Sequence, residues 1–217
     1  MKFADQLLDS YDSVFSAIVD DIAEKGYSIR PNVLASDIAP QLSERLQQIS
    51  PSLFKPAGIG RESDQHRNRF VRTDDICWMK GDSDAERLWL KWCERLQTQL
   101  NRSLFLGLFS FESHFAHYAE GDFYKKHLDA FKGNTNRVLS VVLYLNPNWL
   151  PENGGELVLY DQQDSVITKL SPSFGTLVVF LSEDFPHEVL PAQRDRFSVA
   201  GWFRVNASSA GKVDPPR

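Results

Sequence analysis

The part of the chain that follows residue 104 is a succession of short segments in which apolar and polar residues alternate. These segments span 105–118, 137–145, 156–160, 166–170, 175–181 and 197–205. Glycine, proline, asparagine and aspartate stand between them, as is typical of turns that join β-strands. Because the strands follow one another without intervening helices, the pattern predicts a sandwich or a jelly roll.

The first hundred residues carry a different pattern, with apolar residues at helical spacing. This pattern predicts amphipathic helices over 3–24, 35–49 and 83–101. Short strands are expected at 27–29 and 76–79. A turn-rich polar stretch at about 50–70 has no periodicity, and loops of that length are usually disordered or functional lids.

The chain has 217 residues, of which 42% are hydrophobic, enough for one domain with a sizeable core. We therefore expect a single domain that is mainly β, a sandwich or a jelly roll, with supporting α-helices. Its expected parts are a helical support over 1–103 that includes the turn-rich loop, a β core over 104–206 and a flexible tail over 207–217.

Charge and cysteine content exclude several classes of function. A net charge of −5 provides no basic surface for nucleic acid or an anionic membrane. Asp5, Asp9 and Asp12 interrupt the N-terminal segment, so it lacks the apolar core of a signal peptide, and no apolar run is long enough to cross a membrane. Cys77 and Cys93 form no metal or disulfide motif, so we expect a cytoplasmic location.

One pair of residues, His127 and Asp129, indicates a metal site. Glycines at 121 and 133 argue against a helix here, and in an extended backbone residues two apart point to the same face. His187 follows an apolar strand about sixty residues later, and a jelly roll can bring two such segments together. Two imidazoles and one carboxylate suit non-haem Fe(II), although zinc accepts the same ligands. We expect the lone histidines His66, His114 and His117 to be solvated or hydrogen-bonded.

A second feature is Arg196, which shares one face of its predicted strand with Trp202. An inward-facing guanidinium needs an anion, and its two-pronged shape suits a carboxylate. The hydroxyl of Tyr144, at the end of another apolar strand, can donate to the same carboxylate. A structural ion pair with Asp195 or Asp184 is the alternative.

Several motifs resemble those of the Fe(II)/2-oxoglutarate dioxygenases. They are YAEGDFYKKHLD at 118–129, LYLNPNW at 143–149, GGEL at 154–157, PHEVLP at 186–191, and RTD at 72–74 followed by Trp78. In detail the chain is similar to the prolyl 4-hydroxylase branch, and within it to the HIF-type prolyl hydroxylases and their bacterial relatives. The resemblance covers roughly residues 70–206, and it implies a double-stranded β-helix (jelly roll) with a catalytic core over 104–206 and a lid at about 57–73.

This resemblance implies a role for each matching residue. His127, Asp129 and His187 are implied as iron ligands, and no catalytic group beyond the metal and cosubstrate ligands is implied. The implied cosubstrate residues are Arg196 and Tyr144 at the distal carboxylate of 2-oxoglutarate, Tyr118 near the metal and Trp202 in the pocket wall. An implied charge pair between Asp74 and Arg137 ties the lid to the core.

The resemblance also implies cofactors and a reaction. Fe(II), 2-oxoglutarate and O2, with ascorbate as a candidate reductant, hydroxylate a proline in a protein partner and release succinate and CO2. Elongation factor Tu is a candidate partner, while neither nucleic acid nor a membrane is expected. Two alternatives stay open: a hydroxylase of a free amino acid or other small molecule, and a cupin-like metal-binding module without turnover.

Overall fold

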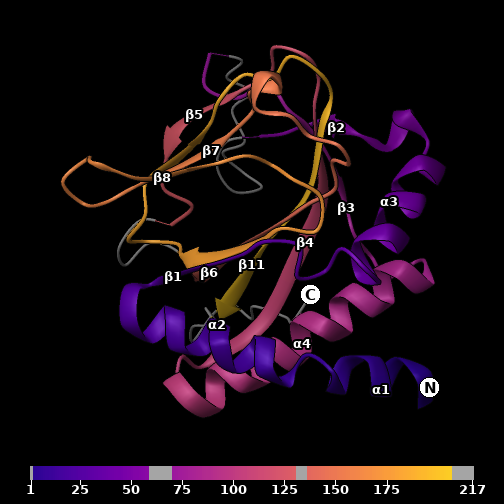
Figure 1. The fold of residues 1–217 in the computed structure, drawn as a ribbon, viewed down its shortest axis with the longest axis vertical. Coiled ribbons are helices and arrows are strands. Elements are labelled where there is room, and N and C mark those ends of the chain that lie inside the picture. The colour runs from indigo at the N-terminus through magenta and orange to yellow at the C-terminus, as the bar shows by residue number, and fades with distance from the viewer. Residues whose placement is uncertain (1, 59–69, 131–135, 207–217) are drawn as a thin grey trace, which may run out of the picture.

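The structure, a computed structural model of the 217-residue chain, describes residues 2–58, 70–130 and 136–206 (Figure 1). The central part of the predicted lid, 59–69, and the predicted tail, 207–217, lie outside the described residues. The mainly β architecture expected from the alternating segments is confirmed.

Helices form where apolar residues repeat at helical spacing. They are α1 (Lys2–Asp9), α2 (Asp12–Lys25), α3 (Ile38–Gln48) and α4 (Asp84–Leu104), with 3-10 turns η1 (Pro51–Leu53) and η2 (Pro151–Asn153). The single helix predicted over 3–24 is instead divided at Ser10 and Tyr11. Their backbone N–H groups bond to Leu7 and Leu8 three residues back, which tightens and ends α1.

Eleven strands form two antiparallel sheets within the described residues. The large sheet has the order β1-β9-β6-β11-β4-β3-β2 and the small sheet the order β5-β10-β7-β8. Strands of the large sheet are β1 (Tyr27–Arg30), β2 (Lys55–Pro56), β3 (Asp75–Trp78), β4 (Leu108–Tyr118), β6 (Arg137–Tyr144), β9 (Leu177–Leu181) and β11 (Arg196–Val205). Strands of the small sheet are β5 (Tyr124–His127), β7 (Leu157–Tyr160), β8 (Val166–Leu170) and β10 (His187–Val189).

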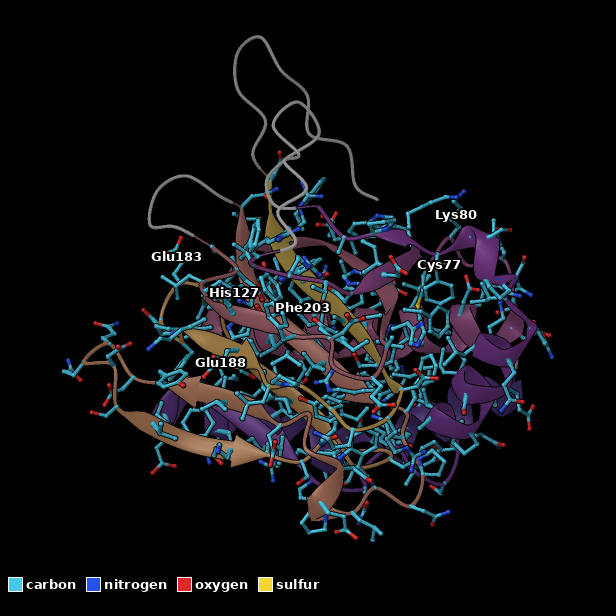
Figure 2. All side chains as sticks on the ribbon, turned by 90° about the horizontal axis from the view of Figure 1, so that it is seen from above. Cys77, Lys80, His127, Glu183, Glu188 and Phe203 are labelled. Carbon is cyan, nitrogen blue, oxygen red and sulfur yellow. The ribbon has the colours of Figure 1, made fainter. Side chains whose placement is uncertain are left out.

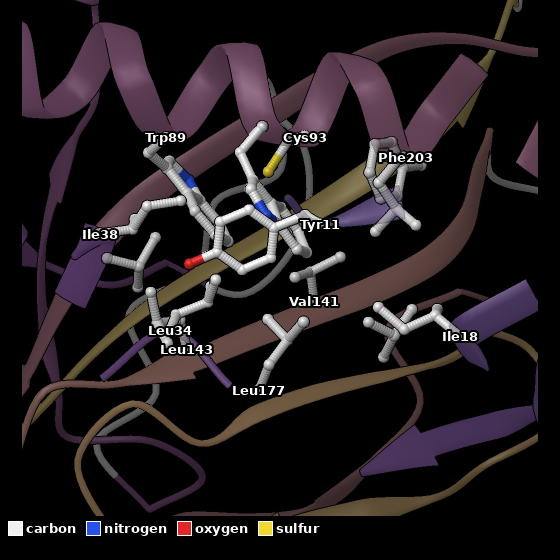
Figure 3. Packing of buried hydrophobic residues seen from close by; sticks show 14 of the residues in the cluster. Tyr11, Ile18, Leu34, Ile38, Trp89, Cys93, Val141, Leu143, Leu177 and Phe203 are labelled. Carbon is white, nitrogen blue, oxygen red and sulfur yellow. The ribbon is translucent and has the colours of Figure 1, made fainter. Parts of the chain in front are cut away.

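Each face of the large sheet contacts a different partner, because successive side chains of a strand point to opposite faces. On β6, Leu139, Val141 and Leu143 pack among the buried residues of the helices, including those drawn in Figure 3. Tyr144 lies on the other face and packs with Leu159 of the small sheet. Figure 1 shows the helices on one side of the molecule and β5, β7 and β8 on the other. This second interface, between the sheets, holds the candidate site.

None of the helices within 2–58, 70–130 and 136–206 combines the length and apolar character that crossing a bilayer requires.

Candidate active site

The two histidines of the predicted triad meet across the small sheet. His127 ends β5 and His187 begins β10, and the two residues are direct partners in that antiparallel pair. Their ring centroids lie 4.2 Å apart. Asp129 lies two residues after the end of β5, with its Oδ1 3.6 Å from Nε2 of His127 and its Oδ2 3.6 Å from Nε2 of His187. All three candidate ligand atoms lie within 4.8 Å of one another. Figure 2 shows His127 on the opposite side of the molecule from α3.

Hydrogen bonds to the backbone determine which nitrogen of each histidine faces the aspartate. Nδ1 of His127 lies 2.8 Å from the carbonyl oxygen of Lys125, and Nδ1 of His187 lies 3.1 Å from that of Phe185. Because a carbonyl oxygen only accepts, each Nδ1 carries the proton and each Nε2 keeps a lone pair. Backbone carbonyls hold metal-binding histidines in this way in many proteins.

The charges at the triad also suit a metal. Burial lowers the pKa of His187 to about 4, and His127 beside it acts in the same direction, so His187 is neutral near pH 7. For Asp129, burial acts to raise the pKa, but His187 and His127 outweigh it and hold the pKa well below its usual value. Two imidazoles and one carboxylate form a donor set that fits Fe(II) or zinc.

The same pocket extends from the triad to Arg196, which begins β11. Arg196 is 2% exposed and donates from Nε to the carbonyl oxygen of Gly155 at 2.9 Å. Its guanidinium carbon lies 5.0 Å from the ring centroid of Tyr118 and 5.1 Å from that of Tyr144. Arg196 therefore presents a buried positive charge to the pocket between two tyrosine rings.

The alternative in which Arg196 makes a structural ion pair is wrong. Asp195 lies 3.2 Å from His117 instead, and Asp184 accepts a hydrogen bond from Gln162. Within the part of the chain that the structure describes, no carboxylate oxygen lies within 4.0 Å of the Arg196 nitrogens. A buried guanidinium without a carboxylate is costly, which favours an anionic ligand at this point.

Tyr144 provides an unsatisfied hydroxyl beside Arg196. Its side chain is fully buried, and its hydroxyl has no hydrogen-bond partner among the described residues. Burial raises the pKa of Tyr144 to about 12, although Arg196 acts in the opposite direction, so the hydroxyl keeps its proton and can donate. A cation and a hydroxyl donor at the same end of one pocket fit a carboxylate.

The predicted charge pair between Asp74 and Arg137 is not formed. Both oxygens of Asp74 accept from Arg72, each at 2.7 Å. The reason is local, since residues 72 and 74 share one face of an extended segment and the fork of an arginine matches a carboxylate. Arg137 instead lies over the ring of Trp202, at 3.5 Å from its centroid, and 3.4 Å from Glu112. Trp202 itself lines the pocket, as expected.

Sequence reasoning missed two aromatic contacts of the pocket. The ring of Tyr124 stacks on that of His127, with centroids 3.4 Å apart, and the guanidinium carbon of Arg72 lies 4.3 Å from the centroid of the Tyr124 ring.

His114 differs from the expectation of a solvated or hydrogen-bonded side chain. It is 2% exposed and its Nδ1 has no partner among the described residues. Burial lowers its pKa to about 3, and His114 lines the pocket beside Trp202. His66 lies outside the described residues.

The sequence of residues 113–204 matches the family model of the 2OG-Fe(II) oxygenase superfamily. A prolyl-4-hydroxylase from Pseudomonas putida is 38% identical and superposes with a TM-score of 0.80 over 89% of this chain and 100% of that one. The prolyl hydroxylase of Trichoplax adhaerens, solved with a hypoxia-inducible factor peptide, is 27% identical and superposes with a TM-score of 0.79 over 92% of each chain.

A curated relative, the hypoxia-inducible factor prolyl hydroxylase of Caenorhabditis elegans, is 25% identical over 199 residues. The match covers 86% of this chain and 27% of the length of that relative.

The chain belongs to the 2OG-Fe(II) oxygenase superfamily, and prolyl hydroxylases are among its relatives. It is a 2-oxoglutarate-dependent enzyme whose family uses Fe(II), 2-oxoglutarate and O2. The expectation of a jelly roll is confirmed, and the alternative of a metal-binding module without turnover is wrong.

Proposed function

We propose that this protein hydroxylates a prolyl residue in a protein substrate, with Fe(II) held by His127, Asp129 and His187. The observation that carries this proposal is that these three candidate metal ligands share one pocket with Arg196, a buried arginine that has no carboxylate partner among the described residues. The fit of the metal rests on the two Nε2 lone pairs and the ionised carboxylate of Asp129. When bound, iron with 2-oxoglutarate and O2 supplies the oxidation of an unactivated C–H bond, with succinate and CO2 as the other products.

Arg196 and Tyr144 are proposed to bind the distal carboxylate of 2-oxoglutarate. Gly155 holds Nε of Arg196 and thereby fixes the plane of the guanidinium. An arginine fork binds a carboxylate through two parallel hydrogen bonds, and the hydroxyl of Tyr144 adds a third donor. Tyr118, whose ring lies beside Arg196, is proposed to contact the cosubstrate closer to the metal. These residues supply binding energy and orientation.

The aromatic wall at the other end of the pocket is proposed to receive the substrate. Trp78 is 45% exposed, and its ring centroid lies 5.0 Å from His114 and 6.4 Å from Trp202. Aromatic faces pack well against a proline ring and exclude water from the reacting carbon. An exposed rim of this kind suits a proline on a flexible segment of a partner.

Elongation factor Tu is our candidate partner, on the basis of the sequence resemblance to bacterial relatives. Ascorbate stays a candidate reductant. Cys77 and Cys93 are both free thiols, which supports the cytoplasm as the site of the reaction.

Mass spectrometry of elongation factor Tu and of a host proteome tests the substrate. The protein is incubated with Fe(II), 2-oxoglutarate and O2, and a parallel sample contains the His127→Ala variant. We expect one added oxygen atom on a defined proline of a protein, present only with the unmodified enzyme. An oxygen atom added to free amino acids, with none on any protein, would favour the small-molecule alternative.

A further inference from the structure

Two buried serines lead from Asp129 to the loop that precedes His187. Ser140, on β6, donates from its hydroxyl to Oδ2 of Asp129 at 2.7 Å. The hydroxyl of Ser182, which directly follows β9, lies 2.9 Å from that of Ser140. Ser140 is 1% exposed and Ser182 is 0% exposed. Neither serine was singled out by the sequence motifs.

The direction of the two hydrogen bonds follows from counting protons. An ionised carboxylate only accepts, and a serine hydroxyl has one proton to donate. Because Ser140 donates its proton to Asp129, Ser182 must donate to Ser140. The order Ser182 to Ser140 to Asp129 is therefore the one arrangement in which all three groups are satisfied. Hydrogen bonds in such a chain strengthen one another, because each donor is polarised by the bond that it accepts.

The two serines connect segments that are far apart in the sequence. Ser140 lies on the face of β6 that also carries Tyr144, so it points toward the pocket. The backbone N–H of Ser182 donates to the carbonyl oxygen of Val138, which fixes the end of β9 against β6. From Ser182 the chain turns toward Phe185, whose carbonyl oxygen accepts from His187. The pair thus links the segments that carry the carboxylate and the second histidine.

The hydrogen bond from Ser140 also determines how the carboxylate of Asp129 is oriented. Asp129 follows the end of β5 and lies in no helix or strand, so the backbone alone leaves its side chain free to rotate. The bond from Ser140 occupies one lone pair of Oδ2 and sets the carboxylate plane. Outer hydrogen bonds of this kind orient metal ligands and raise their affinity for the ion.

We propose that Ser140 is a positioning residue of the metal site and that Ser182 acts through it by holding its hydroxyl in the donating orientation. The inference rests on the proposed role of Asp129 as a metal ligand. It assigns to the serines no contact with the metal, the cosubstrate or the substrate.

Binding of Mn(II), measured on the purified full chain by electron paramagnetic resonance, tests the proposal without turnover. We expect Ser140→Ala to weaken Mn(II) binding about 10-fold, in the range found when outer partners of metal ligands are removed. Ser182→Ala should weaken it by a smaller factor. Ser140→Thr keeps the hydroxyl and suits a strand, so it should restore most of the affinity.

Ser113→Ala is the matched control. Ser113 is a buried serine on β4 that accepts from the indole of Trp89, and it lies outside the pocket lining. Its replacement should lower thermal stability without changing the dissociation constant for Mn(II). A Co(II) visible spectrum should change in Ser140→Ala and stay unchanged in Ser113→Ala.

Two outcomes would overturn the proposal, and only the second would also contradict the proposed metal site. Folded Ser140→Ala and Ser182→Ala proteins that bind Mn(II) as tightly as the unmodified protein would remove the positioning role alone. Failure of the unmodified protein to bind Mn(II) or Co(II) would remove both the positioning role and the proposed metal site.

Discussion

His127 and His187 stand directly opposite each other in the pairing of β5 with β10, and their ring centroids are 4.2 Å apart. The ring of His187 also lies 4.8 Å from that of Phe180, edge to face, so the apolar interior of the large sheet supports it. The register of two short strands therefore brings the two imidazoles together. A shift of that register by one residue would turn one imidazole to the opposite face.

Removal of either imidazole should abolish turnover, because two ligands no longer hold the ion in a defined geometry. We expect His187→Ala and His127→Ala to fold with nearly the stability of the unmodified protein. Neither variant should bind Fe(II) measurably under anaerobic titration calorimetry. Tight one-site binding of iron in His187→Ala would contradict this assignment.

Arg196→Ala should raise the KM for 2-oxoglutarate about 10- to 100-fold, since a hydrogen bond to a charged group contributes about 1.5–3 kcal/mol. Tyr144→Phe removes one neutral donor and should raise the KM only about 5-fold. The affinity for Mn(II) in the absence of 2-oxoglutarate should be unchanged in both. Arg194→Ala, which removes an exposed arginine that lies over Trp149, serves as the control and should leave the KM unchanged.

Gly155→Ala should impair the cosubstrate site without touching the triad. The backbone of Gly155 has a φ of 70°, which costs an alanine roughly 1–2 kcal/mol. A Cβ at this position would meet Cβ of Ala192 at 2.9 Å and Cδ of Arg196 at 3.2 Å. Because Arg196 must shift, we expect a lower melting temperature together with a higher KM for 2-oxoglutarate. An unchanged KM at a lower melting temperature would show that Arg196 does not need this support.

Glu86 should make the folded state sensitive to acid. Its buried carboxylate accepts from Arg45 at 2.7 Å and from the backbone N–H groups of Gly81 and Asp82 at 3.0 and 3.2 Å. Burial acts to raise the pKa of Glu86, but Arg45 and the amides outweigh it and lower the pKa below its usual value. A lowered folded-state pKa means that this stabilisation is present above the unfolded pKa of about 4.3 and is lost as the pH falls through the folded value.

Glu86→Gln should therefore reduce the free energy of unfolding at pH 7 by about 1–3 kcal/mol. Its stability should also fall less steeply than that of the unmodified protein when the pH drops below the unfolded pKa. Urea titrations at several pH values measure both effects, and Asp84→Asn, which alters an exposed carboxylate, is the control. Parallel pH profiles for Glu86→Gln and the unmodified protein would exclude the role assigned to Glu86.

The sequence predicted those parts of the site that depend on strand alternation. The H-x-D spacing placed His127 and Asp129 on one side of an extended segment, and the even positions of the last strand placed Arg196 and Trp202 together in the pocket. Both predictions needed only the period of two of a β-strand. Consecutive short strands without helices likewise predicted a sandwich or a jelly roll, and the family resemblance implied the jelly roll.

The contacts that the sequence did not predict depend on tertiary placement. Ser140 reaches Asp129 only because β6 and the end of β5 lie side by side, and nothing in its neighbours along the chain indicates this bond. The family resemblance implied a pair between Asp74 and Arg137, although a nearer arginine, Arg72, lies two residues from Asp74 in an extended segment and binds it instead. The break between α1 and α2 could not be predicted, because neither Ser10 nor Tyr11 is a glycine or a proline and both residues can also continue a helix.

The most direct test of the oxygenase account is the formation of succinate from 2-oxoglutarate under air. Purified protein is given Fe(II) and ascorbate, and succinate is measured with the unmodified enzyme, His127→Ala and Arg196→Ala. We expect iron-dependent succinate from the unmodified enzyme, none from His127→Ala, and from Arg196→Ala a rate that recovers only at high 2-oxoglutarate. Equal succinate formation by all three proteins, or none from the iron-loaded unmodified enzyme with elongation factor Tu or proline peptides present, would contradict the account.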